Sequence, residues 1–299
     1  MKKIIAAAVA TAFVAPAFAA DISVSGDIEY RYVMSADDGI AGAYDDSDIK
    51  VTATEELANG MTITAFVELL DAKSTASADV GATAQGGDTE IIVSMPGMGT
   101  VSMGAGDHAA NRVDELGSPA DTGMGAASIA ASDGTTLVTN WTLPQLVNGL
   151  TVNVSAGLDD STQIDSVDNE TNSTSYGLSY NMGSFTVAYG AMDTEGAAYS
   201  PSYIGAQFSA GALTVGVDSA SDDGAAGTDS QEIGATYNLG DTAVYVQTQS
   251  VAAAGGSTVN SSAFGVLHSV GGGLKLRAES INSDTATDDQ TTIAVLYAF

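Results

Sequence analysis

The sequence predicts an all-β fold, a closed antiparallel transmembrane β-barrel of about sixteen strands. Three observations lead to this fold class. Apolar and polar residues alternate through most of the chain, tight turns alternate with long Asp- and Gly-rich connections, and 44% of the residues are hydrophobic. Despite that hydrophobicity, no stretch beyond the amino-terminal segment approaches the roughly 18 to 20 apolar residues that a helical membrane span needs.

The amino-terminal segment has the pattern of a secretory signal peptide. Lys2 and Lys3 precede an apolar run over residues 4–14, and Ala17 and Ala19 form an A-x-A cleavage site. The alternative interpretation is a helical membrane anchor, but the run is too short to span a bilayer. We therefore expect residues 1–19 to be a signal peptide and residues 20–299 to form a single barrel domain.

The chain is strongly acidic and contains no cysteine. Its 8 Lys and Arg residues stand against 37 Asp and Glu residues, which gives a formal net charge of −29 at pH 7. Nucleic acid and anionic membrane surfaces are therefore not expected as partners. Without disulfides, an exported chain of this size has to be held by its own hydrogen bonding and burial.

The alternation has the period of two that is typical of a strand with one apolar and one polar face. It begins in "DISVSGDIEYRYVM", residues 21–34, and is sharpest in "GLKLRAES", residues 273–280. The chain ends on another such stretch, "QTTIAVLYAF", whose last residue is aromatic. We expect this last strand to pair with the first, so that the sheet has no open edge.

Short and long connections alternate between the predicted strands. Tight turns such as "LANG" and "NMGS" follow one strand, and long acidic segments such as "DDSTQIDSVDNETN" follow the next. Because these segments recur at regular intervals, they are better interpreted as loops of a β-meander than as disorder. The third long loop, residues 106–132, is the longest stretch without period two and is predicted to hold a short helix around "AANRVDEL".

A soluble β-sandwich also alternates, but its apolar faces point inward. An outer-membrane barrel instead has an apolar face toward lipid and a polar face toward a water-filled lumen. Only a closed sheet satisfies every backbone group in lipid, which explains why many strands are needed. The export signal and the regular rhythm of short turns and long loops favour the membrane barrel.

The chain resembles the Gram-negative general porins and is similar to the sixteen-stranded trimeric porins of proteobacteria. The likeness lies in "ADISVSGDIEYRY" after the signal peptide, "GMGTVSMGAGD" before the third loop, the hairpin "TYNLGDTAVYV" and the terminal "AVLYAF". It implies an outer-membrane homotrimer through which small hydrophilic solutes diffuse, with loop three folded into the lumen. It also implies that Tyr297 and Phe299 form a terminal signal for the outer-membrane assembly machinery.

Sequence motifs of enzymes are missing, since there is no G-x-S-x-G, G-x-G-x-x-G, P-loop or H-E-x-x-H pattern. His108 and Arg112 in loop three are candidate pore-lining residues, whereas His268 is interpreted as a strand residue near an interface. The leading hypothesis is a passive diffusion channel. The alternatives are a substrate-selective outer-membrane channel and a secreted acidic surface-layer or adhesive β-protein.

The scarce basic residues suggest a pore constriction. A charge that faces lipid costs about 2 to 4 kcal/mol near the midplane, so we expect the basic residues of strands to line one lumen wall. This predicted basic wall consists of Arg31, Lys50, Lys275 and Arg277. Loop three would oppose it with acidic residues, which creates a transverse field across the opening. In the alternative interpretation these acids are ordinary solvated loop surface; they are Asp107, Asp114, Glu115 and Asp121.

The remaining long loops are rich in Asp and admit two interpretations. Carboxylate oxygens suit Ca²⁺, which these loops would bind together with neighbouring loops or lipopolysaccharide, although EF-hand spacing is missing. Alternatively, the acids serve solubility in a salty habitat. Under both interpretations the channel mouth is negative, so we expect a preference for cations. The residues concerned are Asp37, Asp38, Asp45, Asp46, Asp48, Asp159, Asp160, Asp222 and Asp223.

Overall fold

The fold is described from a computed structural model of the chain. The predicted signal peptide, residues 1–19, lies outside the described residues. The structure describes residues 20–35, 42–75, 88–113, 115–119, 136–159, 172–195, 200–222, 228–253, 256–284 and 289–299.

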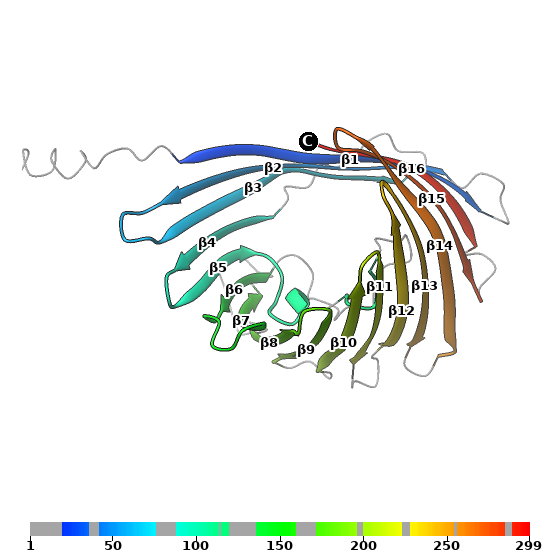
Figure 1. The fold of residues 1–299 in the computed structure, drawn as a ribbon. Helices are drawn as coiled ribbons and strands as arrows, with labels where there is room; N and C mark the ends of the chain where they lie inside the picture. Colours follow the sequence, from blue (N-terminus) through cyan, green and yellow to red (C-terminus); the bar gives the residue numbers. More distant parts are fainter. Residues whose placement is uncertain are drawn as a thin grey trace, which may run out of the picture.

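Sixteen antiparallel strands form one closed barrel, in which each strand pairs with its neighbours in the sequence (Figure 1). The predicted all-β barrel is therefore confirmed. The strands are β1 (Asp21–Ser35), β2 (Gly42–Glu56), β3 (Thr62–Thr75), β4 (Thr89–Met95), β5 (Gly99–Ala105), β6 (Thr136–Thr142), β7 (Leu150–Asp159), β8 (Asn172–Asn181), β9 (Phe185–Thr194), β10 (Pro201–Ala210), β11 (Leu213–Asp222), β12 (Thr228–Leu239), β13 (Thr242–Ala253), β14 (Thr258–Gly271), β15 (Leu274–Ser283) and β16 (Gln290–Ala298).

The barrel closes where the first strand pairs with the last. The register of β1 and β16 places Ile28 opposite Tyr297. Beyond the end of β16, the backbone of Phe299 exchanges two hydrogen bonds with that of Gly26, at 3.0 and 3.1 Å. The predicted pairing of the terminal strand with the first is confirmed, and it removes the open edge that a linear sheet would have.

The outer face of the barrel is apolar and the inner face is polar. Ile22, Ile204 and Phe264 are large hydrophobic residues, yet they are exposed by 71%, 61% and 60%. Along the strands, the alternate positions point inward and bury polar side chains such as Glu29 and Gln247. This distribution inverts that of a soluble protein and is the one expected of a barrel with lipid outside and water inside.

Tight turns join the strands at one end of the barrel. Gly183, between β8 and β9, has a φ of 83°, and nothing lies within 4 Å of the position that a Cβ would take. Glycine is therefore favoured there by the left-handed backbone and not by lack of space. The strand ends that lead into the long connections lie at the other end, and most residues of these connections fall outside the described part of the chain.

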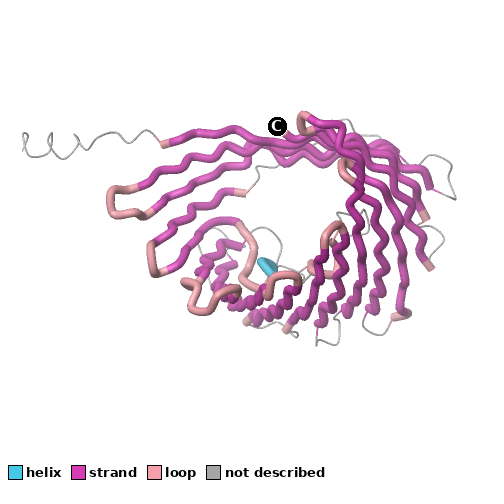
Figure 2. Tube along the Cα trace, in the orientation of Figure 1, coloured by secondary structure: helices cyan, strands magenta, loops and turns pink. Residues whose placement is uncertain are grey.

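The connection between β5 and β6 contains the short helix η1 (Asn111–Val113), which lies inside the ring of strands (Figures 1 and 2). It contacts β8 and β9. Ala110 and Val113 pack there against Met192 and Tyr203 in a small buried cluster that Leu116 completes. The helix predicted in this region is thus a single 3₁₀ turn. Within the described residues, no helix has the length and apolar character needed to cross a membrane.

Candidate functional site

Two arginines of the predicted basic wall bind one carboxylate. Arg31 donates to Glu29 from Nε at 2.7 Å and from Nη2 at 3.0 Å. Arg277 donates to the same carboxylate through its own Nη2. Ala294 on β16 lies between the two arginines in the register, where its small side chain leaves room for both. Because Arg277 and Glu29 are exposed by only 3% and 7%, this ion pair is poorly screened by solvent.

Lys50 and Lys275 are more accessible members of the basic wall. The Nζ atom of Lys50 lies 3.8 Å from Glu68 Oε1 and 4.0 Å from the ring centroid of Phe66. Lys275 is exposed, on the inward-facing register of β15. The barrel closure brings the strands that carry the four predicted basic residues, β15, β1 and β2, next to one another through β16.

Loop three places two predicted acidic residues in exposed positions. Asp107 precedes η1, and Glu115 follows it with a left-handed φ of 68°, a conformation that is uncommon outside glycine. The strands beneath η1, β8 and β9, lie halfway round the ring from β16 and β1. The other two predicted acids, Asp114 and Asp121, lie outside the described residues.

Arg112 ties loop three to the neighbouring wall. Its Nη2 donates to Glu90 Oε1 at 2.8 Å and to Ser102 Oγ at 3.1 Å, and its Nε donates to the carbonyl oxygen of Asp107 at 3.3 Å. The side chain keeps 29% of its surface exposed. Arg112 therefore bridges the start of the loop to β4 and β5, and its outer surface remains accessible.

His108 is enclosed between the loop and the wall. Its ring is 1% exposed, with Nδ1 at 3.3 Å from Ser155 Oγ and Nε2 at 3.3 Å from Ser173 Oγ. Burial lowers the pKa of the imidazole below its usual value, and the neighbouring Asp107 carboxylate opposes this shift without cancelling it. A neutral ring offers one donor and one acceptor, which suits two hydroxyl partners.

Further along the loop, backbone amides bind side chains of the inner wall. The amide of Leu116 donates to the hydroxyl of Tyr203 at 2.7 Å, and the amide of Gly117 donates to Asp218 Oδ2 at 2.5 Å. Tyr203 also donates to Asp218 Oδ2, at 3.2 Å. The loop is therefore anchored to β10 and β11 through contacts that sequence reasoning did not identify.

A comparison with protein-family models identifies the family of this barrel. The sequence model described as Gram-negative porin matches residues 6–288, which is most of the chain. The chain belongs to the Gram-negative porin family. It is an outer-membrane β-barrel channel and not an enzyme, so the interpretation as a secreted surface-layer protein is wrong. No curated protein sequence matches this porin.

Solved structures support the same fold. Three engineered variants of the Rhodopseudomonas blastica porin are 18%, 19% and 20% identical to this chain, each with a TM-score of 0.74. The match covers 93% of this chain and 100% of each variant. At this identity the likeness shows the shared barrel fold alone.

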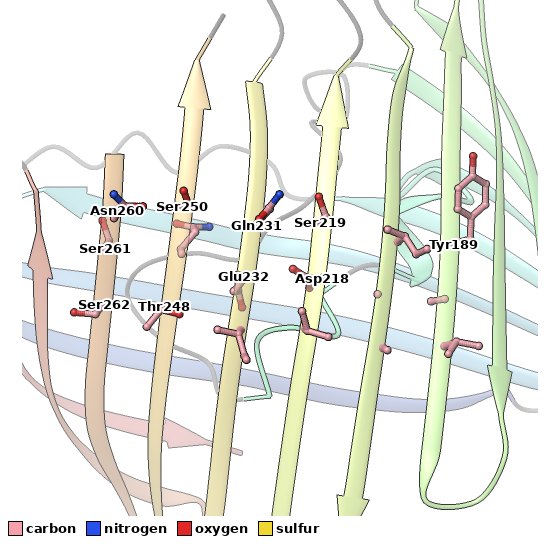
Figure 3. Close-up of a pocket in the computed structure, with 18 of the residues that line it drawn as sticks. Tyr189, Asp218, Ser219, Gln231, Glu232, Thr248, Ser250, Asn260, Ser261 and Ser262 are labelled. Atoms are coloured by element: carbon pink, nitrogen blue, oxygen red, sulfur yellow. The ribbon is translucent and has the colours of Figure 1, made fainter. Parts of the chain in front are cut away.

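The inner wall of this porin carries buried acidic residues that were not among the predicted constriction residues. Glu29, Glu90, Asp218, Glu232 and Glu279 are each exposed by 9% or less. Asp218 and Glu232 lie directly opposite each other on β11 and β12 (Figure 3). A signal existed for two of them, since Glu29 and Glu279 lie two residues from a predicted inward arginine and so share its face.

A hollow of about 1070 Å³ follows strands β7–β15. Its lining includes outward-facing apolar side chains, such as those of Tyr189 and Ile204, and polar ones nearer the long loops, such as Ser219, Gln231 and Asn260 (Figure 3). These outward-facing side chains assign it to the outer surface of the barrel.

The predicted Ca²⁺ sites fall mostly outside the part of the chain that can be described. Of the nine acidic residues considered, only Asp48 and Asp222 have described side chains. Within the described residues, no group of three or more His, Cys, Asp or Glu side chains is placed to hold a metal ion.

The terminal aromatics lie together on the outer face. The rings of Tyr297 and Phe299 are stacked, with centroids 6.0 Å apart and an interplanar angle of 26°. Both residues are exposed, at the end of the barrel that carries the tight turns. A role in assembly remains a prediction.

Proposed function

We propose that this porin lets small hydrophilic solutes and ions diffuse passively across the outer membrane and that it prefers cations. The observation that carries the proposal is the charge on loop three, where Asp107 and Glu115 are exposed on a segment attached to the inner wall. The net charge of −29 adds a negative potential at the mouth of the channel.

The same loop is proposed to narrow the lumen. Six hydrogen bonds support this placement, because each joins residues 108–118 to an inward side chain of the strands β7 to β13; the partners are Ser155, Ser173, Ser175, Tyr203, Asp218 and Gln247. Polar solutes small enough to pass the loop would diffuse, and larger ones would be excluded.

Across the lumen, the proposed basic wall is weaker than a count of its charges suggests. Arg31 and Arg277 bind Glu29, and Lys50 lies near Glu68. Partial neutralisation of the basic side leaves the acidic side dominant, which favours cation over anion passage. The transverse field therefore orients polar solutes, while the excess of negative charge in the lumen favours cations.

The assembly of this porin is also part of the proposal. We propose a homotrimer in contact with outer-membrane lipid and lipopolysaccharide, because the chain belongs to the porin family and resembles its trimeric members. Closure of single channels in three equal steps would support a trimer, whereas single-step closure throughout would contradict it.

A substrate-selective channel is not favoured by the inward aromatics. Tyr203 and Tyr245 point into the barrel but are exposed by only 1% and 3%. Tyr203 binds loop three and Tyr245 donates to Glu279 at 2.9 Å. These two rings serve the wall and the loop. Phe66, another inward aromatic whose side chain the structure describes, has its ring centroid 4.0 Å from Lys50 Nζ, so the described inner wall has no ladder of accessible aromatics.

Charge-neutral variants test the proposed role of loop three. Asp107→Asn combined with Glu115→Gln removes two exposed charges and should shift the reversal potential in a salt gradient toward anions. Asp241→Asn is the control, since Asp241 is an exposed acid in the tight turn between β12 and β13. If the loop variant keeps the wild-type reversal potential, these two acids do not set selectivity.

A further inference from the structure

Two cross-strand pairs of inward-facing glycines lie beneath loop three. Gly177 on β8 is directly opposite Gly190 on β9, and Gly216 on β11 is directly opposite Gly234 on β12. All four are buried. Glycine within a strand is less favourable than alanine by about 0.5–1 kcal/mol. Glycines in strand interiors often mark a place where another backbone approaches closely. At these four glycines the approaching backbone is that of loop three.

The first pair lies beneath Ala109 and Ala110. A Cβ on Gly177 would collide with the carbonyl oxygen of Ala109, and a Cβ on Gly190 would lie 3.0 Å from Ala110 Cα. Both alanines have no exposed surface. The amide of Ala110 is held at 2.9 Å by Ser175 Oγ. Loop backbone and sheet backbone are therefore in direct contact at this point.

The second pair lies beneath Leu116 and Gly117. A Cβ on Gly216 would collide with the carbonyl oxygen of Leu116, and a Cβ on Gly234 would lie 2.5 Å from that of Gly117. These are backbone atoms, so no flexible side chain can turn aside to make room. The bond from the Gly117 amide to Asp218 Oδ2, at 2.5 Å, holds the loop at this height.

We propose that Gly177, Gly190, Gly216 and Gly234, here called the glycine track, are positioning residues that set how far loop three projects into the lumen. A methyl group at any of them has to push the loop backbone away from the wall and toward the pore axis. The effect on the pore rests on the proposed function, because only a loop that narrows the lumen converts this displacement into a smaller opening.

A thiol crosslink tests the proposal. The chain has no cysteine, and Ser118 Oγ lies 3.2 Å from Gln247 Oε1, between the loop and β13. Ser118→Cys with Gln247→Cys, joined by a short bifunctional thiol reagent that spans the former length of the glutamine side chain, therefore reports whether the loop is attached to the wall. We expect Gly216→Ala with Gly234→Ala to lower the yield of this crosslink and also, in the cysteine-free background, to lower single-channel conductance and the size limit for solutes.

The control is Val215→Ala, which changes the outward-facing neighbour of Gly216 on the same strand and should alter neither readout. Heat-modifiable gel mobility establishes that each barrel has folded. If the double alanine variant does not fold, Gly190→Ala is the milder substitute, because its Cβ would lie 3.0 Å from the loop.

An unchanged crosslink yield in folded variants of the glycine track would overturn the proposal that these glycines position the loop. A lower yield with unchanged conductance would support the track as the seat of the loop and would instead contradict the proposal that the loop narrows the lumen. The two proposals therefore fail in distinguishable ways.

Discussion

Glu29 is the residue on which the basic wall depends. It accepts hydrogen bonds from Arg31 and Arg277, and it is 7% exposed. The alternation of apolar and polar residues along the strands predicted that both arginines face inward. It did not predict their shared partner, because Arg277 and Glu29 are 248 residues apart and meet only when the barrel closes. The alternation therefore predicted the inward face of both arginines but not the carboxylate that neutralises them, and their role in a constriction stays a prediction.

Removing Glu29 should be costly. Glu29→Ala takes the carboxylate away from a nearly buried arginine, and breaking such a pair typically costs about 3–5 kcal/mol. Glu68→Ala is the matched control, since its partner Lys50 lies 3.8 Å away with 38% of its side chain exposed; exposed pairs contribute about 0–1 kcal/mol. Equilibrium unfolding in detergent compares the two, and equal losses would contradict this assignment.

The environment of His108 predicts that the attachment of loop three to the inner wall, here called the seated state, depends on pH. Its pKa is lowered when the loop is seated, so the unseated ring binds a proton more readily. The seated state is therefore fully favoured above the usual histidine pKa of about 6.5 and is weakened as pH falls below it. Single-channel recordings between about pH 7 and pH 5 should show this change. The variant His108→Gln should lack the histidine-dependent part, and an identical pH profile in that variant would exclude His108 as its cause.

At the scale of elements, alternation was sufficient to predict the strands, and β6 shows its limit. Leu137 and Trp141 face outward, but Thr139 between them interrupts the apolar face, so the register of this strand did not follow from its sequence. The indole of Trp141 donates to the carbonyl oxygen of Met98 at 2.9 Å, a contact with the neighbouring turn that no local pattern encodes. Loop three was harder still, because its path follows hydrogen bonds to seven strands and has no period.

The terminal strand carries a prediction about assembly. Phe299 pairs with the backbone of Gly26 and stacks on Tyr297. Deleting Phe299 should therefore reduce the amount of folded barrel in the outer membrane more than it reduces the conductance of the channels that form. Phe208→Ala is the control, because Phe208 is another exposed aromatic near a tight turn. Wild-type amounts of the deletion variant would argue against a terminal assembly signal.

For the whole molecule, the exposure of apolar side chains on the outside and the burial of polar side chains on the inside connect sequence with function. Apolar residues at every second position gave the outward face, and the alternation of short and long connections gave the order of strands around the ring. The closed barrel leaves an interior lined by acids, bases and one attached loop. Its net charge, its exposed loop acids and its partly neutralised arginines all favour the same sign of permeant ion.

The measurement that tests the central claim most directly is the reversal potential of single wild-type channels in a planar bilayer with a salt gradient. The proposed mechanism predicts an open channel whose reversal potential has the sign of cation preference. A channel that prefers anions, or purified folded barrels that form no channel, would contradict it.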